Sequence, residues 1–378
     1  MKKIVSLLLT GAMLLSLCAC GGSASSSGGS SDSSADATAS NDETVTVSIQ
    51  FTFPEESADG ANKVLDQITE ASGGRIQFEK YYSYSFVDTA DVVDALQTNQ
   101  LDMAGLMPTD YSIFSLNGRM CSLPLLNYPD WEAACKIYLS MIYNNEDMLA
   151  EFEDNGLKFY AGYMCPGYQF FCSEDITDTT PNTFNGLTVM CDNAEMQALI
   201  NSYQGGAISV FPTDFLSNLQ NGVAEALMQH VNCAYVFGCF DYVKSAMFFG
   251  EGGFYNFPLA FAMSDDFWNS LPEDLQQIFA EYADDFSREC YTADYALYSN
   301  VAYPALEEAA DNIIMLDDAQ IAEWQAACSD LVENAVTDIE QDSPNVRDAL
   351  SQLKDMIANY DASSFSIGTT NFGTDVEW

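Results

Sequence analysis

The sequence predicts an α/β protein made of two similar lobes. Strand and helix patterns alternate in two separate parts of the chain, an order typical of a parallel or mixed sheet covered by helices. The two parts also share local sequence, because residues 96–102 read LQTNQLD and residues 219–225 read LQNGVAE. Hydrophobic residues make up 48% of the 378 residues, which is enough for a packed core and excludes a disordered acidic chain.

The first part of the chain predicts a β-α-β-α-β unit. Residues 45–51 alternate between apolar and polar side chains, as a half-buried strand does. Apolar residues of the next segment share one helical face, and Gly73 and Gly74 end that helix. The remaining elements are a strand at 76–81, a helix at 90–98 and a strand at 101–106.

The second part repeats this order. A strand at 187–190 leads into a helix over 193–203, which ends at Gly205. The unit is completed by a strand at 207–210, a helix at 212–220 and a strand at 223–227. Ligands of such folds bind beyond the C-terminal ends of the strands, so we expect a cleft that faces these ends in both lobes.

The C-terminal third predicts mainly helices. Pro272 stands in the first turn of a long helix, and the chain has no glycine from there to Asp311. We expect this helix to bend at Pro304. Two further helices are predicted at 317–338 and 344–360, and residues 361–378 have no periodicity and stay unassigned.

The N-terminus has the features of an export signal. Lys2 and Lys3 precede an apolar segment too short to span a membrane, and that segment ends in LCACGG. This ending resembles the lipobox of bacterial lipoproteins, so residues 1–20 predict a lipoprotein signal peptide with Cys20 as the lipidated residue. The alternative is an ordinary secretory signal cleaved nearby. Residues 21–44 are mostly Gly, Ser, Ala, Asp and Thr, and predict a flexible tether. We therefore expect an extracytoplasmic protein, anchored by lipid to the outer face of the cell membrane or located in the periplasm.

The charge balance excludes several functions. The chain has 56 acidic and 12 basic residues, a net charge of −44, whereas nucleic-acid binding needs clustered Lys and Arg. Its single histidine, His230, leaves little scope for a His-based metal site or a Ser-His-Asp triad, and we interpret it as structural or exposed. Phosphate-binding loops, nucleophile elbows and zinc-protease motifs are missing from the sequence. We expect no catalytic activity, no cofactor and no metal.

Nine cysteines follow the export signal and show no CxxC pair. Several stand in apolar segments, as Cys233 does, which favours buried thiols that act as small hydrophobic side chains. The sequence leaves their disulfide state open.

Three motifs stand in order in the second half of the chain. They are FNGLTV at 184–189, PTDFLSNLQNGVAE at 212–225 and LPEDLQ at 271–276, and the first half adds LPLL at 123–126. Together they resemble the solute-binding receptors of TRAP transporters, the DctP-type family, over residues 45–345. The resemblance rests on the order and spacing of the motifs, since each is weak alone.

This resemblance implies a two-lobed, periplasmic-binding-protein-like (venus-flytrap) fold with a long helix across both lobes. It implies a monomeric, non-catalytic receptor that captures a small molecule and delivers it to the permease subunits of a TRAP transporter. Lobe one is expected at 45–165, with 256–300 returning to it. Lobe two is expected at 166–255, with 301–360 packing on it.

The sequence departs from the family where the family holds a ligand carboxylate. Family members have an arginine at the position of Met190 and another at that of Gln169, and Met228, next to Gln229, replaces an acidic residue. Neither Met nor Gln can replace the bidentate contact between arginine and a carboxylate. We therefore expect a neutral, partly apolar or cationic ligand. The candidate ligand-binding residues are Phe53, Met107, Asp110, Gln169, Met190, Asn193, Phe211, Asp214 and Gln229.

Some alternatives remain open at this point. Arg119 or Lys244 could supply the cation that the cleft lacks, which would restore carboxylate binding. The chain could also be the substrate-binding lipoprotein of an ATP-driven transporter, or a solute-sensing module without a permease. The predicted long helix that begins with LPED favours the TRAP interpretation.

Overall fold

The computed structural model describes residues 44–376 and 378. The predicted signal peptide, the lipidation of Cys20 and nearly all of the tether at 21–44 lie outside the described residues. Within the described part of the chain, none of the helices combines the length and the apolar character needed to cross a membrane.

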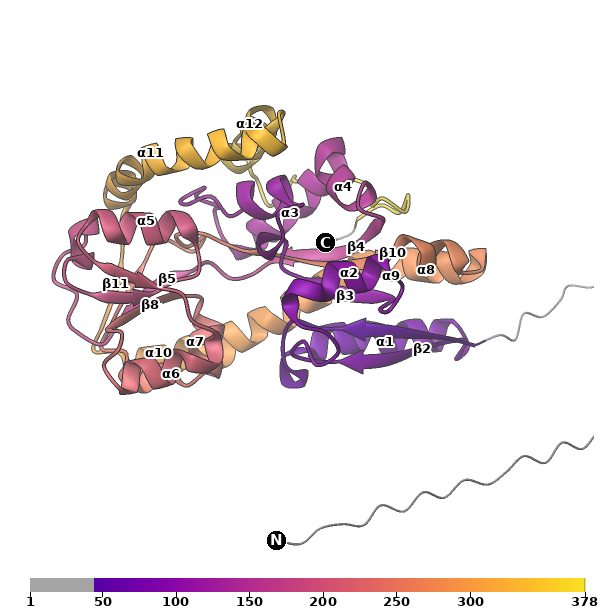
Figure 1. The fold of residues 1–378 in the computed structure, drawn as a ribbon, viewed down its shortest axis with the longest axis horizontal. Helices are drawn as coiled ribbons and strands as arrows, with labels where there is room; N and C mark the ends of the chain where they lie inside the picture. Colours follow the sequence, from indigo (N-terminus) through magenta and orange to yellow (C-terminus); the bar gives the residue numbers. More distant parts are fainter. Residues whose placement is uncertain (1–43, 377) are drawn as a thin grey trace, which may run out of the picture. The chain divides into compact units, whose positions relative to one another are not determined.

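The first lobe contains a five-stranded mixed sheet in the order β2-β1-β3-β10-β4 (Figure 1). Its parallel strands are the three that the alternating pattern predicts, namely β1 (Val45–Gln50), β2 (Ile76–Tyr81) and β3 (Met103–Leu106). The antiparallel strands β4 (Leu157–Met164) and β10 (Pro258–Ser264) were not predicted. Every residue of β10 is buried, so its apolar sequence has no alternation to mark it as a strand.

The second lobe contains a six-stranded mixed sheet in the order β11-β9-β5-β8-β6-β7. The strands are β5 (Gln169–Cys172), β6 (Thr188–Met190), β7 (Gly206–Ile208), β8 (Ala226–Gln229), β9 (Ser245–Phe248) and β11 (Asn312–Met315). The repeated β-α-β-α-β unit supplies β6, β7 and β8, which are parallel neighbours. The prediction placed the last of these strands too early, at 223–227. Residues 221–223 are instead an exposed turn at Gly222, whose φ is 62°.

Helices cover both sheets. In the first lobe they are α1 (Asp59–Ala71), α2 (Val92–Gln97), α3 (Trp131–Asn144), α4 (Glu146–Glu153) and α8 (Asp265–Ser270), with the short helices η3 (Pro108–Asp110) and η4 (Ser115–Met120). In the second lobe they are α5 (Ala194–Ser202), α6 (Pro212–Gln220) and α7 (Val231–Val236). The N-cap side chains Asp130 and Asn193 accept backbone N–H groups at the starts of α3 and α5.

The predicted long helix connects the two lobes. It consists of α9 (Glu273–Leu297), a π-helical turn η7 (Tyr298–Ala302) and α10 (Tyr303–Ala309), and the irregular turn precedes Pro304 as expected. α9 packs on α1 and β4 in the first lobe, whereas α10 packs on α7 in the second (Figure 1). The prediction of two α/β lobes joined by one long helix is therefore confirmed.

The last two helices, α11 (Asp318–Asp342) and α12 (Val346–Ala358), divide between the lobes. Trp324, near the start of α11, is buried in the core of the second lobe. Ile339 at its other end, and Leu353 of α12, belong to the core of the first lobe. The expectation that 301–360 packs on lobe two is thus wrong for the second half of this segment, because its apolar face covers α3 and η4 instead.

The unassigned tail packs on the first lobe. The ring of Phe372 contacts that of Trp268 in a tilted arrangement with the centroids 5.0 Å apart, and the Lys158 ammonium lies over both rings. Trp378 contacts the ring of Tyr291 on α9. Aromatic contacts therefore hold a segment that has no helix or strand of its own.

Candidate functional site

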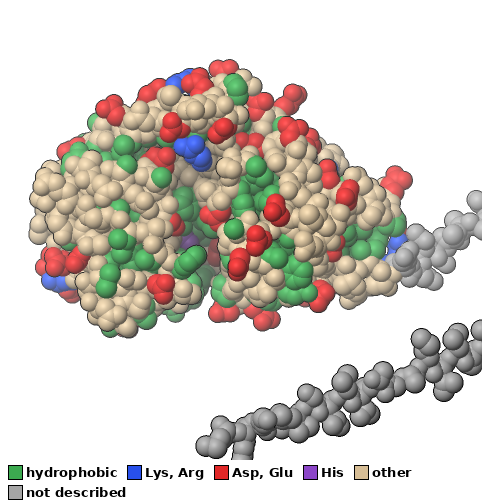
Figure 2. Space-filling model, in the orientation of Figure 1, with side chains coloured by type: hydrophobic (Ala, Val, Ile, Leu, Met, Phe, Trp, Pro, Cys, Tyr) green, Lys and Arg blue, Asp and Glu red, His purple; other side chains and the backbone are tan. Residues whose placement is uncertain are grey.

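Strand register brings the C-terminal edges of the parallel strands in both lobes to face each other. In the first sheet, Leu106 at the end of β3 pairs with Ala260 of β10, close to the Pro258–Met164 pair where β10 begins and β4 ends. In the second sheet, the first residue of β5 pairs with the last residue of β8. The short segment from β4 to β5 joins these two edges directly. Figure 2 shows a hollow between the lobes, with acidic side chains along its margin.

Two antiparallel segments cross between the lobes here, and we call residues 165–168 and 252–257 the crossing segments. Cys165 N donates to Phe257 O at 2.7 Å, and Tyr168 N donates to Tyr255 O at 2.9 Å. At Gly167 the two backbones approach so closely that a Cβ atom would lie 2.6 Å from the backbone N of Gly253. Glycine is therefore required where the segments meet.

Three aromatic residues of the crossing segments, Tyr168, Tyr255 and Phe257, form a cluster with His230, the N-cap residue of α7, and we call this set the ring cluster. The Tyr168 ring lies 4.6 Å from that of Tyr255, 4.9 Å from that of Phe257 and 5.3 Å from the imidazole of His230 (centroid distances). His230 Nδ1 accepts the backbone N–H of Cys233 and caps α7, and burial lowers the pKa of His230 to about 3. The imidazole is therefore neutral at physiological pH and adds no positive charge.

Asp192 lies two residues beyond the end of β6, beside the ring cluster. The Tyr255 hydroxyl donates to its Oδ1 at 3.2 Å. Although the residue is exposed overall, desolvation by the surrounding protein raises the pKa of its carboxyl to about 6, and the negative charge of Asp110 raises that pKa further. Asp192 thus belongs to the second lobe, but its pKa is affected by the charge of a carboxylate in the first lobe.

Asp110, at the end of η3, is that carboxylate of the first lobe. Desolvation raises its pKa to about 6, although the residue reaches solvent. Its charge also raises the pKa values of Tyr84 and Tyr111, after the larger effect of burial. The Tyr111 hydroxyl donates to Thr89 O at 2.7 Å, which fixes the loop between β2 and α2 beside Asp110.

A third carboxylate, Asp294 of α9, lies where the long helix passes both lobes. Tyr163 of β4 donates to its Oδ2 at 3.2 Å, and the Asn232 amide of α7 donates to its backbone oxygen at 2.9 Å. Burial raises the pKa of Asp294 to about 6. The Oδ1 atom of Asn232 is buried and lacks a hydrogen-bond partner among the described residues.

These carboxylates have no basic partner. Among residues 44–376 and 378, no salt bridge includes Asp110, Asp192 or Asp294. Lys244 pairs with Asp175 at 2.6 Å, and it precedes β9 at the edge of the second sheet opposite to Gln229. Lys244 is therefore too far round the sheet to compensate the missing arginines. Arg119 lies in η4, which packs on η3, α4, α11 and α12.

Three of the predicted site residues have amide side chains that form hydrogen bonds with backbone groups of the protein. Gln169 donates to Gly250 O at 3.2 Å and accepts Phe249 N at 2.8 Å. The Gln229 amide oxygen accepts the N–H of His230, and that of Asn193 caps α5. All three lie at the strand ends that face the hollow, but these carbonyl oxygens are already used.

The apolar candidates divide between core and surface. Met190 is buried in a cluster with Phe171 and Leu227, so its side chain packs in the second-lobe core. Phe53 is half-buried and contacts the ring of Phe261, and Met107 is half-buried against the second-lobe core.

The remaining two candidates lie at the start of α6: Phe211 is its N-cap residue and Asp214 stands in its first turn. Both are exposed. Phe211 is 77% exposed. Of the nine candidates, Asp110 is the one whose side chain lies among the charged and aromatic groups at the lobe junction.

Sequence reasoning missed Asp192, Asp294 and the tyrosines around them. A signal existed for Asp192, because it lies two residues after a predicted parallel strand. The crossing segments and α9 gave no such signal, since their residues meet the site only after both lobes have formed.

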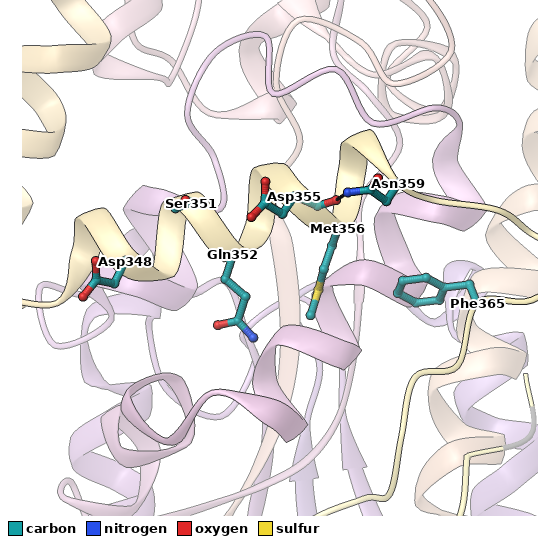
Figure 3. Close-up of a pocket in the computed structure, with 7 residues that line it drawn as sticks. All are labelled: Asp348, Ser351, Gln352, Asp355, Met356, Asn359 and Phe365. Atoms are coloured by element: carbon teal, nitrogen blue, oxygen red, sulfur yellow. Dashed lines mark hydrogen bonds between the residues drawn. The ribbon is translucent and has the colours of Figure 1, made fainter.

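A separate surface hollow lies on α12, away from the lobe junction. Gln352, Met356 and Phe365 point into the same space beneath the helix, with Asp348, Ser351, Asp355 and Asn359 also lining it (Figure 3). It is open to solvent and includes none of the carboxylates or rings described above.

Comparison with solved structures supports the fold. A TRAP periplasmic solute-binding protein from Desulfovibrio salexigens is 14% identical, with a TM-score of 0.72 over 85% of this chain and 98% of that chain. A TRAP solute-binding protein from Rhodoferax ferrireducens, in complex with copurified benzoate, is 18% identical, with a TM-score of 0.70 over 83% and 98%. One from Chromohalobacter salexigens, with bound D-glucuronate, is 16% identical, with a TM-score of 0.68 over 82% and 99%.

Comparison of sequences gives the family. No curated protein is matched by the sequence. The model of the DctP family, described as bacterial extracellular solute-binding protein, family 7, matches residues 54–338. This is a family of solute-binding proteins and not of enzymes, as expected. The chain belongs to the DctP family of bacterial extracellular solute-binding proteins.

Proposed function

We propose that this protein captures a small solute between its two lobes and delivers it to the permease subunits of a TRAP-type transporter. The observation that carries the proposal is the junction where the C-terminal strand edges of both sheets face each other across a hollow. The two crossing segments, the long helix and α11 connect the lobes in the described part of the chain, which suits hinge closure around a ligand.

The solute is not a simple carboxylate. Benzoate and D-glucuronate, which the two relatives hold, are both anions. In this chain Met190 is buried in the core and Gln169 is bound to the backbone, so neither replaces an arginine. Asp110 and Asp192 lie close enough to interact electrostatically, and no salt bridge among the described residues includes either of them. A ligand carboxylate beside them would add a third negative charge.

Delivery to a membrane permease fits an extracytoplasmic receptor anchored through Cys20 to the outer face of the membrane. Residues 21–44, whose composition predicts a tether, would link Cys20 to the lobes. The receptor acts as a monomer, because capture needs only the two lobes of one chain.

The test is to identify the solute that copurifies with the protein by mass spectrometry, and then to measure its uptake by cells that lack the gene. We expect uptake to require this protein and to stop when the ion gradient is collapsed. Uptake that depends on ATP and survives loss of the gradient would indicate an ATP-driven transporter. Normal uptake without the gene would indicate a sensing module.

A further inference from the structure

We propose that the solute is an organic cation, whose ammonium or quaternary ammonium group binds against the ring cluster between Asp110 of the first lobe and Asp192 of the second. This inference rests on the proposed function, since it assigns a ligand class to the same hollow. It goes beyond that function by giving the sign of the ligand's charge and the groups that recognise it.

The first argument is charge. Asp110 and Asp192 come from opposite lobes, and each lies close enough to affect the electrostatics of Tyr168. Both residues are exposed in this structure, although the surrounding protein already partly desolvates their carboxylates. Closure of the lobes would remove the remaining exposure to solvent and increase their mutual repulsion, which disfavours an empty closed state. A cation removes both costs, and therefore binds the closed form better than the open one.

The second argument is the hydrogen-bonding inventory. Carboxylates accept hydrogen bonds and do not donate them when ionised. Asn232, which is 3% exposed and lies against Asp294, adds a buried Oδ1 atom without a partner among the described residues. The imidazole of His230 is neutral. The lobe junction thus offers acceptors and no positively charged donor among the groups described, and an ammonium group, which only donates, matches it.

The third argument is the ring cluster. Tyr168, Tyr255 and Phe257 pack with centroid distances between 4.6 and 5.1 Å, and the Tyr255 hydroxyl is bonded to Asp192. Aromatic rings beside carboxylates are the surroundings that quaternary ammonium groups prefer, because ring faces attract cations without needing a hydrogen bond.

A metal ion does not fit this arrangement. Within the described residues, no three His, Cys, Asp or Glu side chains are close enough together to hold one. Carboxylates spread over two lobes and a long helix suit a cation with the dimensions of a small organic molecule.

The experiment compares matched ligands by thermal shift and calorimetry on the purified protein. Choline is paired with 3,3-dimethyl-1-butanol, its neutral analogue of the same shape, and putrescine, benzoate and glucuronate complete the set. We expect a cation to bind, and choline to bind at least about tenfold more tightly than its neutral analogue if the ligand carries a quaternary ammonium group. Failure of both choline and putrescine to bind would overturn the proposal.

Two variants with the same charge change separate the site from general surface charge. Asp192→Asn keeps an acceptor for the Tyr255 hydroxyl and removes the negative charge. We expect it to weaken binding of the cation at least about tenfold, with little effect on the neutral analogue. Asp330→Asn, on the exposed surface of α11, serves as the control and should change affinity less than twofold. Equal losses in both variants would overturn the proposal.

The outcome is distinguishable from failure of the proposed function. If an anionic or neutral solute copurifies and drives uptake, the receptor function stands and the cation proposal is wrong. If a cation copurifies but uptake does not need the protein, the ligand class stands and delivery to a permease is wrong.

Discussion

Replacing Gly167 by alanine tests whether the crossing segments are packed as tightly as the structure indicates. A Cβ atom at this position would lie 2.6 Å from both the backbone carbon of Gly252 and the backbone N of Gly253. Contacts this short require movement, and both atoms belong to the backbone, which cannot rotate away as a side chain can. The two segments would have to separate, with loss of the hydrogen bond from Tyr168 to Tyr255.

Overpacking a well-packed interior lowers the unfolding free energy by about 1–3 kcal/mol, and by more where the backbone must shift. We take the upper value, about 3 kcal/mol, for Gly167→Ala. With an unfolding entropy of about 2.1 cal/mol/K per residue, this loss lowers the Tm of a chain of this length by roughly 4 °C.

The assay is differential scanning fluorimetry with Gly206→Ala as the matched control. Gly206 also stands in the second lobe, but the nearest atom to its added Cβ is Thr188 Oγ1 at 3.9 Å, so we expect an unchanged or slightly higher Tm. On the same entropy scale, a Tm within about 1 °C of the wild type would mean that Gly167→Ala costs far less than expected. That result would refute the close approach of the crossing segments.

Three further variants test the second lobe. His230→Asn keeps an N-cap side chain but removes the buried imidazole. The pKa of His230 is lower in the folded protein than in the unfolded chain, so its contribution to stability is present above pH 6.5 and is lost as the pH falls toward 3. Between neutral pH and pH 5, the unfolding free energy of the variant, measured by urea titration, should therefore fall by about 1–2 kcal/mol less than that of the wild type. Trp324→Ala should cost about 3–5 kcal/mol of unfolding free energy, since the ring is fully buried against Phe184, Phe249 and Phe254; a loss below about 1 kcal/mol would contradict this packing. Met190→Arg should lower the Tm far more than Met190→Leu, because it buries an unpaired charge; equal melting would mean that Met190 reaches solvent.

Helices and strands with one buried face and one exposed face were predicted well from the sequence. β1 is half-buried and alternates, and α6 starts at Pro212 and ends close to Gly222, so periodicity and end signals marked both. β4 and β10 were missed for the opposite reason. They lie in the middle or at the covered edge of a sheet with almost every residue buried, and a continuous apolar run does not reveal whether it is helix or strand.

The candidate site was predicted less well, and Met190 shows why. Its position after a parallel strand indicated a residue near the ligand, but the sequence could not decide which face of the sheet the side chain occupies. Two residues later, Asp192 stands beyond the strand end and is exposed. Gln169 and Gln229 lie at the correct edge, yet their amides serve the backbone, which depends on contacts from distant segments.

The sequence by itself determined the two repeated α/β units, the long C-terminal helix and the shortage of positive charge, because these follow from local periodicity and composition. The expectation that this helix crosses both lobes came from the resemblance to the DctP-type family. The tertiary structure decided which charges meet. Asp110, Asp192 and Tyr255 are far apart along the chain and come together only because the crossing segments join the facing edges of the two sheets. Burial and electrostatic coupling depend on that three-dimensional proximity, which no local pattern encodes.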